Sequence, residues 1–181
     1  MEQIKQMKIR FEKEIVSTIQ VYFMDILNTH SVIYDIDGEV INEVNASSYC
    51  KTLRFSSERK DLCLSHSWEL SKNAIRFKKP FEAVCPGGLI FLSVPIVLGE
   101  NVVVGAHCAA ISNPIRSKFS TYDIAAKFYI DAHILWEAVK KAPQIPKPVL
   151  KIARERVLST TELISKILTH IHALQQRKQL Q

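Results

Sequence analysis

Residues 89–111 read LIFLSVPIVLGENVVVGAHCAAI, and this stretch decides the fold. Leu89 to Leu98 and Val102 to Ile111 are almost continuously apolar, and Gly99-Glu100-Asn101 lies between them. Apolar runs of this length that are bounded by a tight turn are typical of buried strands. We therefore predict a central β-hairpin whose two strands lie inside a sheet.

Further strand signals lie on the N-terminal side of this hairpin. Ser31 to Ile41 contains two short runs rich in β-branched residues around Asp37-Gly38, a dipeptide that is a strong hairpin signal. Phe81 to Cys85 reads as one more short strand, which follows the helix-ending Pro80. The sheet is thus expected to begin near residue 31.

Four segments show the three-and-four spacing of apolar residues that marks amphipathic helices. Ser56 or Ser57 is expected to cap the second of them, and Ser120 with Asp123 resembles a capping box at the start of the third. The predicted helices are residues 2–29, 56–79, 120–141 and 149–178.

The order of these elements predicts the fold class. Strands and helices in this sequence fit an α+β architecture, a PAS-like antiparallel sheet with covering helices, flanked by N- and C-terminal helices. Pro143, Pro146 and Pro148 predict a stiff linker. The expected organisation is an N-terminal helix (1–30), a sensory domain (31–142), the linker (143–148) and a C-terminal signalling or dimerisation helix (149–181).

The C-terminal helix also carries a short heptad pattern. Two seams of mostly apolar residues repeat over about two and a half heptads, which suggests a parallel dimer, a homodimer in this case. An equally open alternative is that the helix folds back on its own domain, because the pattern is short of three to four heptads. The seam residues are Val157, Ile164 and Ile171 in one position and Thr160, Ile167 and Leu174 in the other.

Composition and charge narrow the class of protein. The chain has 181 residues, of which 47% are hydrophobic, enough to bury a core. No apolar run approaches the roughly 20 residues of a membrane helix, and the N-terminus does not resemble a secretory signal, so we expect a cytoplasmic protein with no membrane partner. The net charge of +6 comes almost entirely from residues 147–181. DNA is therefore an expected partner only through a domain not in this chain.

Catalytic motifs are not visible in the sequence. It has no nucleophile elbow, phosphate-binding loop, dinucleotide fingerprint or HExxH, and only five glycines. We predict that the protein is not an enzyme and has no catalytic residues.

Four cysteines are the most suggestive chemistry-bearing residues. Cys50, Cys63, Cys85 and Cys108 match no known metal-binding spacing, but the predicted elements place all four at one side of the sheet. In a reducing compartment they are thiols or metal ligands, and a shared thiolate site would select zinc or an iron-sulfur cluster. Inert buried thiols and a redox switch are the alternatives.

Five short motifs along the chain together resemble the PocR ligand-binding domain family. The resemblance runs over roughly residues 8–140. The motifs are Tyr49-Cys50 with Arg54, then Cys63, Cys85-Pro86-Gly87-Gly88-Leu89, Val94-Pro95-Ile96 and Val104-Gly105.

This resemblance implies a PAS-like sensory domain of the kind that precedes AraC-type DNA-binding domains or histidine kinases and senses small hydrocarbon derivatives such as short diols. Two departures matter. Pro86-Gly87 replaces the His-Ala of the family pattern, and Ala109-Ala110-Ile111 stands where Gly-Gly-Gln is common. A ligand contact from that His or Gln would be absent, and its absence favours metal or redox sensing over diol sensing.

Three hypotheses for function result. The chain is the input domain of a prokaryotic transcription regulator or signal-transduction protein that binds a small ligand, or it is an iron-sulfur or zinc redox or gas sensor, or it is a pure dimerisation module. In the first case the predicted ligand-binding residues are Arg54, Trp68, Phe81, Phe91 and His107. In the second the predicted metal ligands are Cys50, Cys63, Cys85 and Cys108.

Overall fold

The structure, a computed structural model, describes residues 13–25, 30–45, 47–55, 57–59, 61–114, 116–142 and 145–179. Within these residues helices and strands follow one another as an α+β chain, and the predicted class is confirmed. The elements are α1 (Lys13–Asp25), β1 (His30–Asp35), β2 (Val40–Asn45), α2 (Ser48–Phe55), α3 (Asp61–Phe77), β3 (Phe81–Val84), β4 (Ile90–Leu98), β5 (Val102–Ala110), α4 (Lys118–Phe128), α5 (Ala132–Lys141) and α6 (Lys147–Gln179).

The strands form one antiparallel sheet in the order β2-β1-β5-β4-β3. β4 and β5 are the predicted central hairpin, and β1 and β2 are joined by the predicted turn at Asp37-Gly38. Asp35 Oδ1 accepts hydrogen bonds from the backbone N–H groups of Asp37 and Glu39 at 2.9 and 2.8 Å, and Gly38 has a φ of +89° that favours glycine.

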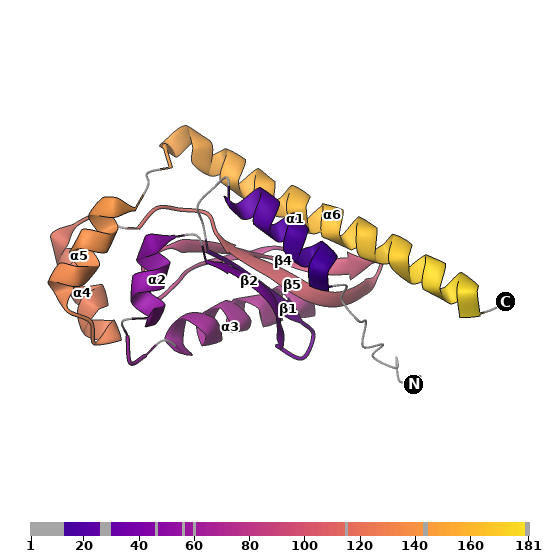
Figure 1. The fold of residues 1–181 in the computed structure, drawn as a ribbon, viewed down its shortest axis with the longest axis horizontal. Helices are drawn as coiled ribbons and strands as arrows, with labels where there is room; N and C mark the ends of the chain where they lie inside the picture. Colours follow the sequence, from indigo (N-terminus) through magenta and orange to yellow (C-terminus); the bar gives the residue numbers. More distant parts are fainter. Residues whose placement is uncertain are drawn as a thin grey trace.

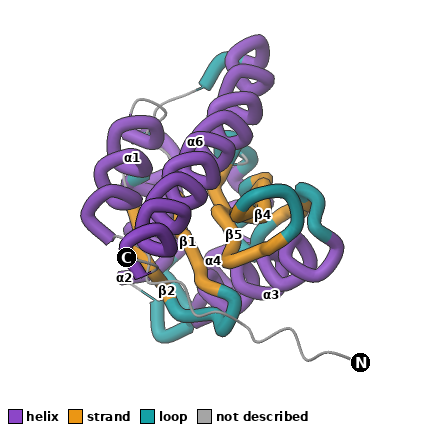
Figure 2. The backbone as a smooth tube through the Cα atoms, turned by 90° about the vertical axis from the view of Figure 1, so that its right-hand side faces the viewer, coloured by secondary structure: helices purple, strands orange, loops and turns teal. Residues whose placement is uncertain are grey.

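Helices cover both faces of the sheet. Figure 1 shows α1 and α6 side by side above it and α3 below it, with α2, α4 and α5 gathered at one end. In the turned view, the strands lie between the α1–α6 pair and α3 (Figure 2). None of the described helices has the length and apolarity needed to cross a membrane.

Alternation along the strands divides the core between the two faces. On β1, Val32 and Tyr34 point toward α2 and α3, whereas Ile33 points toward α1 and α6. Ile164 of α6 is buried in the same cluster as Ile33. Both faces of the central strands are therefore buried, which explains the continuous apolar run from which the fold was predicted.

One predicted helix is divided in the structure, and another is preceded by a helix that was not predicted. The segment predicted as one helix over 56–79 is preceded by a separate helix, α2, so that Cys50 lies within a helix and not ahead of one. The segment 120–141 is broken at Tyr129, which has a left-handed φ of +55°. Ser117, and not the predicted Ser120, caps α4, and Asp131 caps α5 by accepting from two backbone N–H groups.

The C-terminal helix begins earlier than predicted. α6 starts at Lys147, so Pro148 lies in its first turn, where a missing N–H costs nothing. Pro143 and the predicted N-terminal helix beyond Lys13–Asp25 lie outside the described residues. The seam residues Val157, Thr160 and Ile164 are buried against the chain's own sheet, as the fold-back alternative expects.

Candidate functional site

A small cavity lies between the sheet and the two helices α2 and α3. Its surface is almost entirely apolar. Its volume is about 20 Å³, counted as the space open to the centre of a water molecule. That is room for about one water molecule. Any larger ligand therefore needs α2 and α3 to move away from the sheet. The lining residues are His30, Cys50, Leu53, Arg54, Cys63, His66, Ser67, Cys85, Leu89 and Phe91.

The structure brings three of the four cysteines to this cavity. Cys50 comes from α2, Cys63 from α3 and Cys85 from the bend after β3, where its sulfur accepts a hydrogen bond from the Leu89 N–H at 3.3 Å. Cys108 on β5 points to the same side of the sheet but is fully buried and does not line the cavity. All four are free thiols.

The surroundings of the thiols favour their protonated form. Burial, reinforced by the neighbouring Cys85, raises the pKa of Cys50 and raises that of Cys63 to about 12. Burial likewise raises the pKa of Cys85, against the opposing hydrogen bond from Leu89, and that of Cys108 to about 12. A thiolate nucleophile is favoured by a positive environment that lowers its pKa, and in this cavity the burial of the thiols acts in the opposite direction.

The expected metal centre is not assembled. Among the described residues, no group of three or more His, Cys, Asp or Glu side chains is arranged to hold a metal ion. Zinc and iron-sulfur sites require thiolates that converge on a common point. Three of the four predicted ligands line one cavity, and Cys108 is not among its lining residues.

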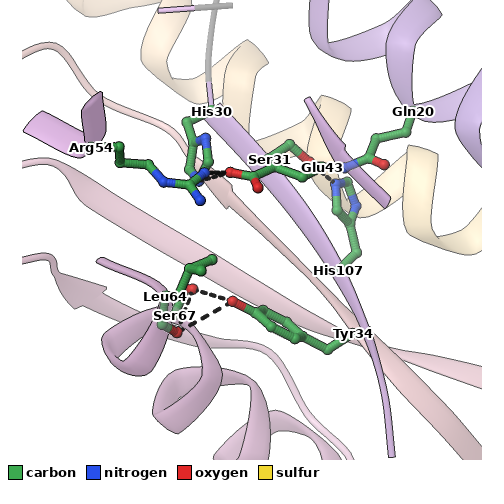
Figure 3. A network of polar contacts seen from close by, with 9 residues as sticks. All are labelled: Gln20, His30, Ser31, Tyr34, Glu43, Arg54, Leu64, Ser67 and His107. Atoms are coloured by element: carbon green, nitrogen blue, oxygen red, sulfur yellow. Dashed lines mark hydrogen bonds and ion pairs between the residues drawn. The ribbon is translucent and has the colours of Figure 1, made fainter. Parts of the chain in front are cut away.

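One wall of the cavity carries a charged cluster. Arg54 from α2 forms an ion pair with Glu43 from β2, and Nε2 of His30 lies 3.5 Å from the same carboxylate (Figure 3). The side chains of Arg54 and Glu43 are only 16% and 24% exposed. An ion pair of this kind contributes little net stability to the fold, because both charges lose part of their hydration.

The α3 side of the cavity carries two polar lining residues, Ser67 and His66. The Tyr34 hydroxyl lies 2.5 Å from Ser67 Oγ, a contact drawn in Figure 3, and burial raises the Tyr34 pKa to about 12. His66 Nε2 is a buried atom without a hydrogen-bond partner, and burial followed by the charge of Lys127 lowers the His66 pKa.

The predicted aromatic residues are distributed differently from the expectation. Phe91 lines the cavity and packs on His30 with ring centroids 5.9 Å apart. Trp68 packs instead on Tyr34 and the β1–β2 turn, and Phe81 packs on Phe77. Neither Trp68 nor Phe81 is among the lining residues.

His107 lies on the opposite face of the sheet from the cavity. It is adjacent to Cys108 on β5, and successive residues of a strand point to opposite faces. Cys108 faces α3, so His107 faces α1 and α6, where it is completely buried. Strand alternation therefore places His107, which was predicted as a ligand-binding residue, away from the cavity.

His107 joins the two flanking helices through a hydrogen-bond chain, the helix relay, formed by Gln20, Ser31, His107 and Thr161. Thr161 Oγ1 donates to the Val157 carbonyl at 2.7 Å, so it accepts from His107 Nδ1 at 2.9 Å. Nε2 of His107 then accepts from Ser31 Oγ at 2.7 Å, and Ser31 accepts from Gln20 Nε2 at 2.8 Å. The hydroxyl hydrogens of Thr161 and Ser31 and the ring N–H of His107 are all used when the imidazole is neutral.

The helix relay and the charged cluster lie back to back on β1 and β2. His30 faces the cavity while the next residue, Ser31, faces the helices (Figure 3). On β2, Glu43 binds Arg54, and the preceding residue, Asn42, donates to Gln20 Oε1 at 2.7 Å. Both strands therefore contact α1 through Gln20, and β1 is connected to α6 through His107.

Replacing His107 with leucine should lower the free energy of unfolding by about 2 kcal/mol, because the buried Ser31 hydroxyl loses its acceptor. His107→Gln is the matched control, since its amide can donate to Thr161 and accept from Ser31. Urea unfolding at pH 7.5 measures both. Equal losses in the two variants would contradict the role assigned to the relay.

The comparisons with known proteins identify the family. The family described as "Sensory domain found in PocR" matches residues 10–173, nearly the whole chain. The chain belongs to this family. The PocR match includes α6 as far as Ala173, in agreement with the packing of α6 on the sheet. It also confirms the resemblance drawn from the cysteine-containing motifs.

Other comparisons give weaker likenesses. No curated protein matches the chain. The GAF domain/HD domain protein from Geobacter sulfurreducens is 13% identical, with 86% of this chain and 92% of that chain covered and a TM-score of 0.43. Pseudomonas aeruginosa HmgR is 16% identical, with coverages of 87% and 67% and the same TM-score of 0.43.

Sequence reasoning missed His30, which lines the cavity, and Glu43, which pairs with the lining residue Arg54. His30 was assigned to the helical segment before the sheet, although its alternation with Val32 and Tyr34 was a readable signal of β1. Glu43 lies beyond the predicted second strand and gave no signal, because its role depends on an arginine in another element.

Proposed function

We propose that this chain is the input domain of a cytoplasmic signalling protein, and that a small molecule enters the cavity between the sheet and the α2–α3 pair. Membership of the PocR sensory family supports the sensory role. The observation that carries the proposal is the cavity itself, which gathers side chains from β1, α2, α3, the β3–β4 bend and β4 around an apolar space. The role is non-catalytic.

The output runs through the flanking helices. A ligand changes an equilibrium only through its different affinity for the two arrangements. Opening of the cavity moves His30 and Glu43, whose strand neighbours Ser31 and Asn42 hold Gln20 of α1 and, through His107, α6. The helix relay supports a change in how α1 and α6 sit on the sheet.

The proposal also covers the macromolecular partners of this domain, which are DNA and a second copy of the chain. We propose a prokaryotic transcription regulator or related signalling protein, in which DNA is contacted only by a domain outside this chain. A homodimer would use the side of α6 that does not face the sheet, where Leu163 and Leu174 are exposed.

A ligand screen on the whole chain tests the function. Thermal shift with alcohols, diols, amides and carboxylates of two to six carbons should reveal compounds that stabilise the protein. Hydrogen exchange should then change in α1 and in α6 around Thr161. Cys63→Phe fills the cavity and should abolish the shift, whereas Ser65→Phe, on the exposed side of α3, should preserve it.

Two results would overturn the proposal. One is a compound that stabilises the wild type and Cys63→Phe equally, because it binds elsewhere. The other is binding in the cavity that leaves hydrogen exchange in α1 and α6 unchanged, because no signal then leaves the site.

A further inference from the structure

We propose that the ligand of this cavity is a small carboxylate with a short apolar tail, and that its carboxylate takes the place of Glu43 at Arg54. The inference rests on the proposed function and names the class of ligand. It goes beyond the short diols that the family resemblance implies.

The cavity has one permanently charged lining residue. Arg54 projects from α2, while the three lining thiols are neutral because burial raises their pKa values. The rest of the wall is dominated by apolar surface from Leu53, Leu89 and Phe91. One guanidinium at the edge of an apolar chamber is the arrangement that fits a carboxylate with a hydrocarbon tail.

A carboxylate already occupies the place that this ligand would take. In Figure 3 the Arg54 guanidinium reaches the Glu43 carboxylate, with His30 beside the same oxygen. This cation and imidazole form a carboxylate-binding site that the protein's own side chain fills in the closed state. Five guanidinium N–H donors allow planar, two-point binding of a ligand carboxylate.

Glu43 is also well placed to leave. It lies on β2, an edge strand of the sheet, and its side chain is 24% exposed. Exchange of one carboxylate for another at Arg54 conserves the charge of the pair. The difference in free energy between the two pairings is then set by the ligand tail, because burying its methylene groups favours binding.

A neutral ligand cannot make this exchange. An alcohol or a diol leaves the Arg54–Glu43 pair intact. Only the burial of its hydrocarbon part then offsets the free energy needed to open the cavity. A short tail keeps the required movement of α2 and α3 small, because the cavity as it stands holds about one water molecule.

Titration of the full chain with sodium butanoate, butan-1-ol and butane-1,3-diol at constant ionic strength tests the inference. Butanoate should raise the melting temperature and the two alcohols should not. Arg54→Gln should weaken butanoate binding at least tenfold, because a charge-assisted hydrogen bond is lost, and Glu43→Gln should strengthen it by about tenfold, because the competitor is removed.

A second ion pair provides matched controls. Arg154 Nη2 and Glu82 Oε2 lie 3.1 Å apart, away from the cavity lining. Arg154→Gln and Glu82→Gln should titrate with butanoate as the wild type does. If Arg54→Gln does not fold, Glu43→Gln alone decides the outcome.

Unchanged or weaker butanoate binding in Glu43→Gln would overturn the inference, as would equal binding in Arg54→Gln and the wild type. Binding of butan-1-ol or the diol that Cys63→Phe abolishes, without a response to butanoate, would also overturn it. In that last case the sensory proposal stands, because a ligand still occupies the cavity.

Discussion

Cys63 in the folded protein should react with iodoacetamide about 1,000-fold more slowly at pH 8 than the same residue in urea. Burial raises the Cys63 pKa from 9.0 to about 12, and only the thiolate is nucleophilic. Three pH units correspond to about a thousandfold smaller thiolate fraction. Quenched labelling followed by peptide mass spectrometry measures the two rates.

The four cysteines need not behave alike in this experiment. Cys63 is half-buried, so its protonation controls its rate, whereas the fully buried Cys108 also needs the structure to open. Labelling of Cys63 within tenfold of the unfolded rate would contradict the neutral, apolar cavity. It would revive the thiolate site that a metal or redox sensor requires.

Acidification should destabilise the protein through His107. Burial lowers the His107 pKa from 6.5 to about 4, so the unfolded chain binds more protons than the folded one between these values. The contribution of the neutral imidazole is fully present above pH 6.5 and is lost as the pH falls toward 4. The loss is on the order of 3 kcal/mol at pH 4.

His107→Gln isolates this contribution. The glutamine does not titrate, and the effect of His66, whose pKa is also lowered, cancels in the comparison. Urea unfolding from pH 7.5 to pH 4 should therefore show a shallower decline in the variant. Parallel curves for the wild type and His107→Gln would mean that the folded protein accepts a proton at His107 without cost.

Much of the fold was predictable because burial on both faces leaves a strong mark on the sequence. The runs that became β4 and β5 are continuous in apolar residues, and Asp37-Gly38 marks the β1–β2 turn. The break at Tyr129 was missed because apolar residues continue through it, and the short helix α2 was not predicted. The starts of α4 and α5 depend on local caps, Ser117 and Asp131, that compete with other nearby serines and aspartates.

The site was predictable only in part, and the reason is the strand register. Cys50, Cys63, Cys85, Arg54 and Phe91 do meet at one cavity. A strand that is apolar on both sides, however, does not reveal which residues point to which face. For that reason the sequence could not separate His107 from Cys108, although the two are neighbours and serve opposite sides of the sheet.

α6 extends beyond its last hydrogen bond to the β4–β5 hairpin. The helix runs unbroken from Lys147 to Gln179, and Thr169 Oγ1 accepts from the Gly99 N–H at 2.9 Å. At about 1.5 Å per residue, the part of the helix beyond Thr169 is about 15 Å long. If a ligand tilts α6 on the sheet as proposed, a tilt of about 10° would carry the end of this extension through about 3 Å relative to its base, so a neighbouring domain could read the tilt there.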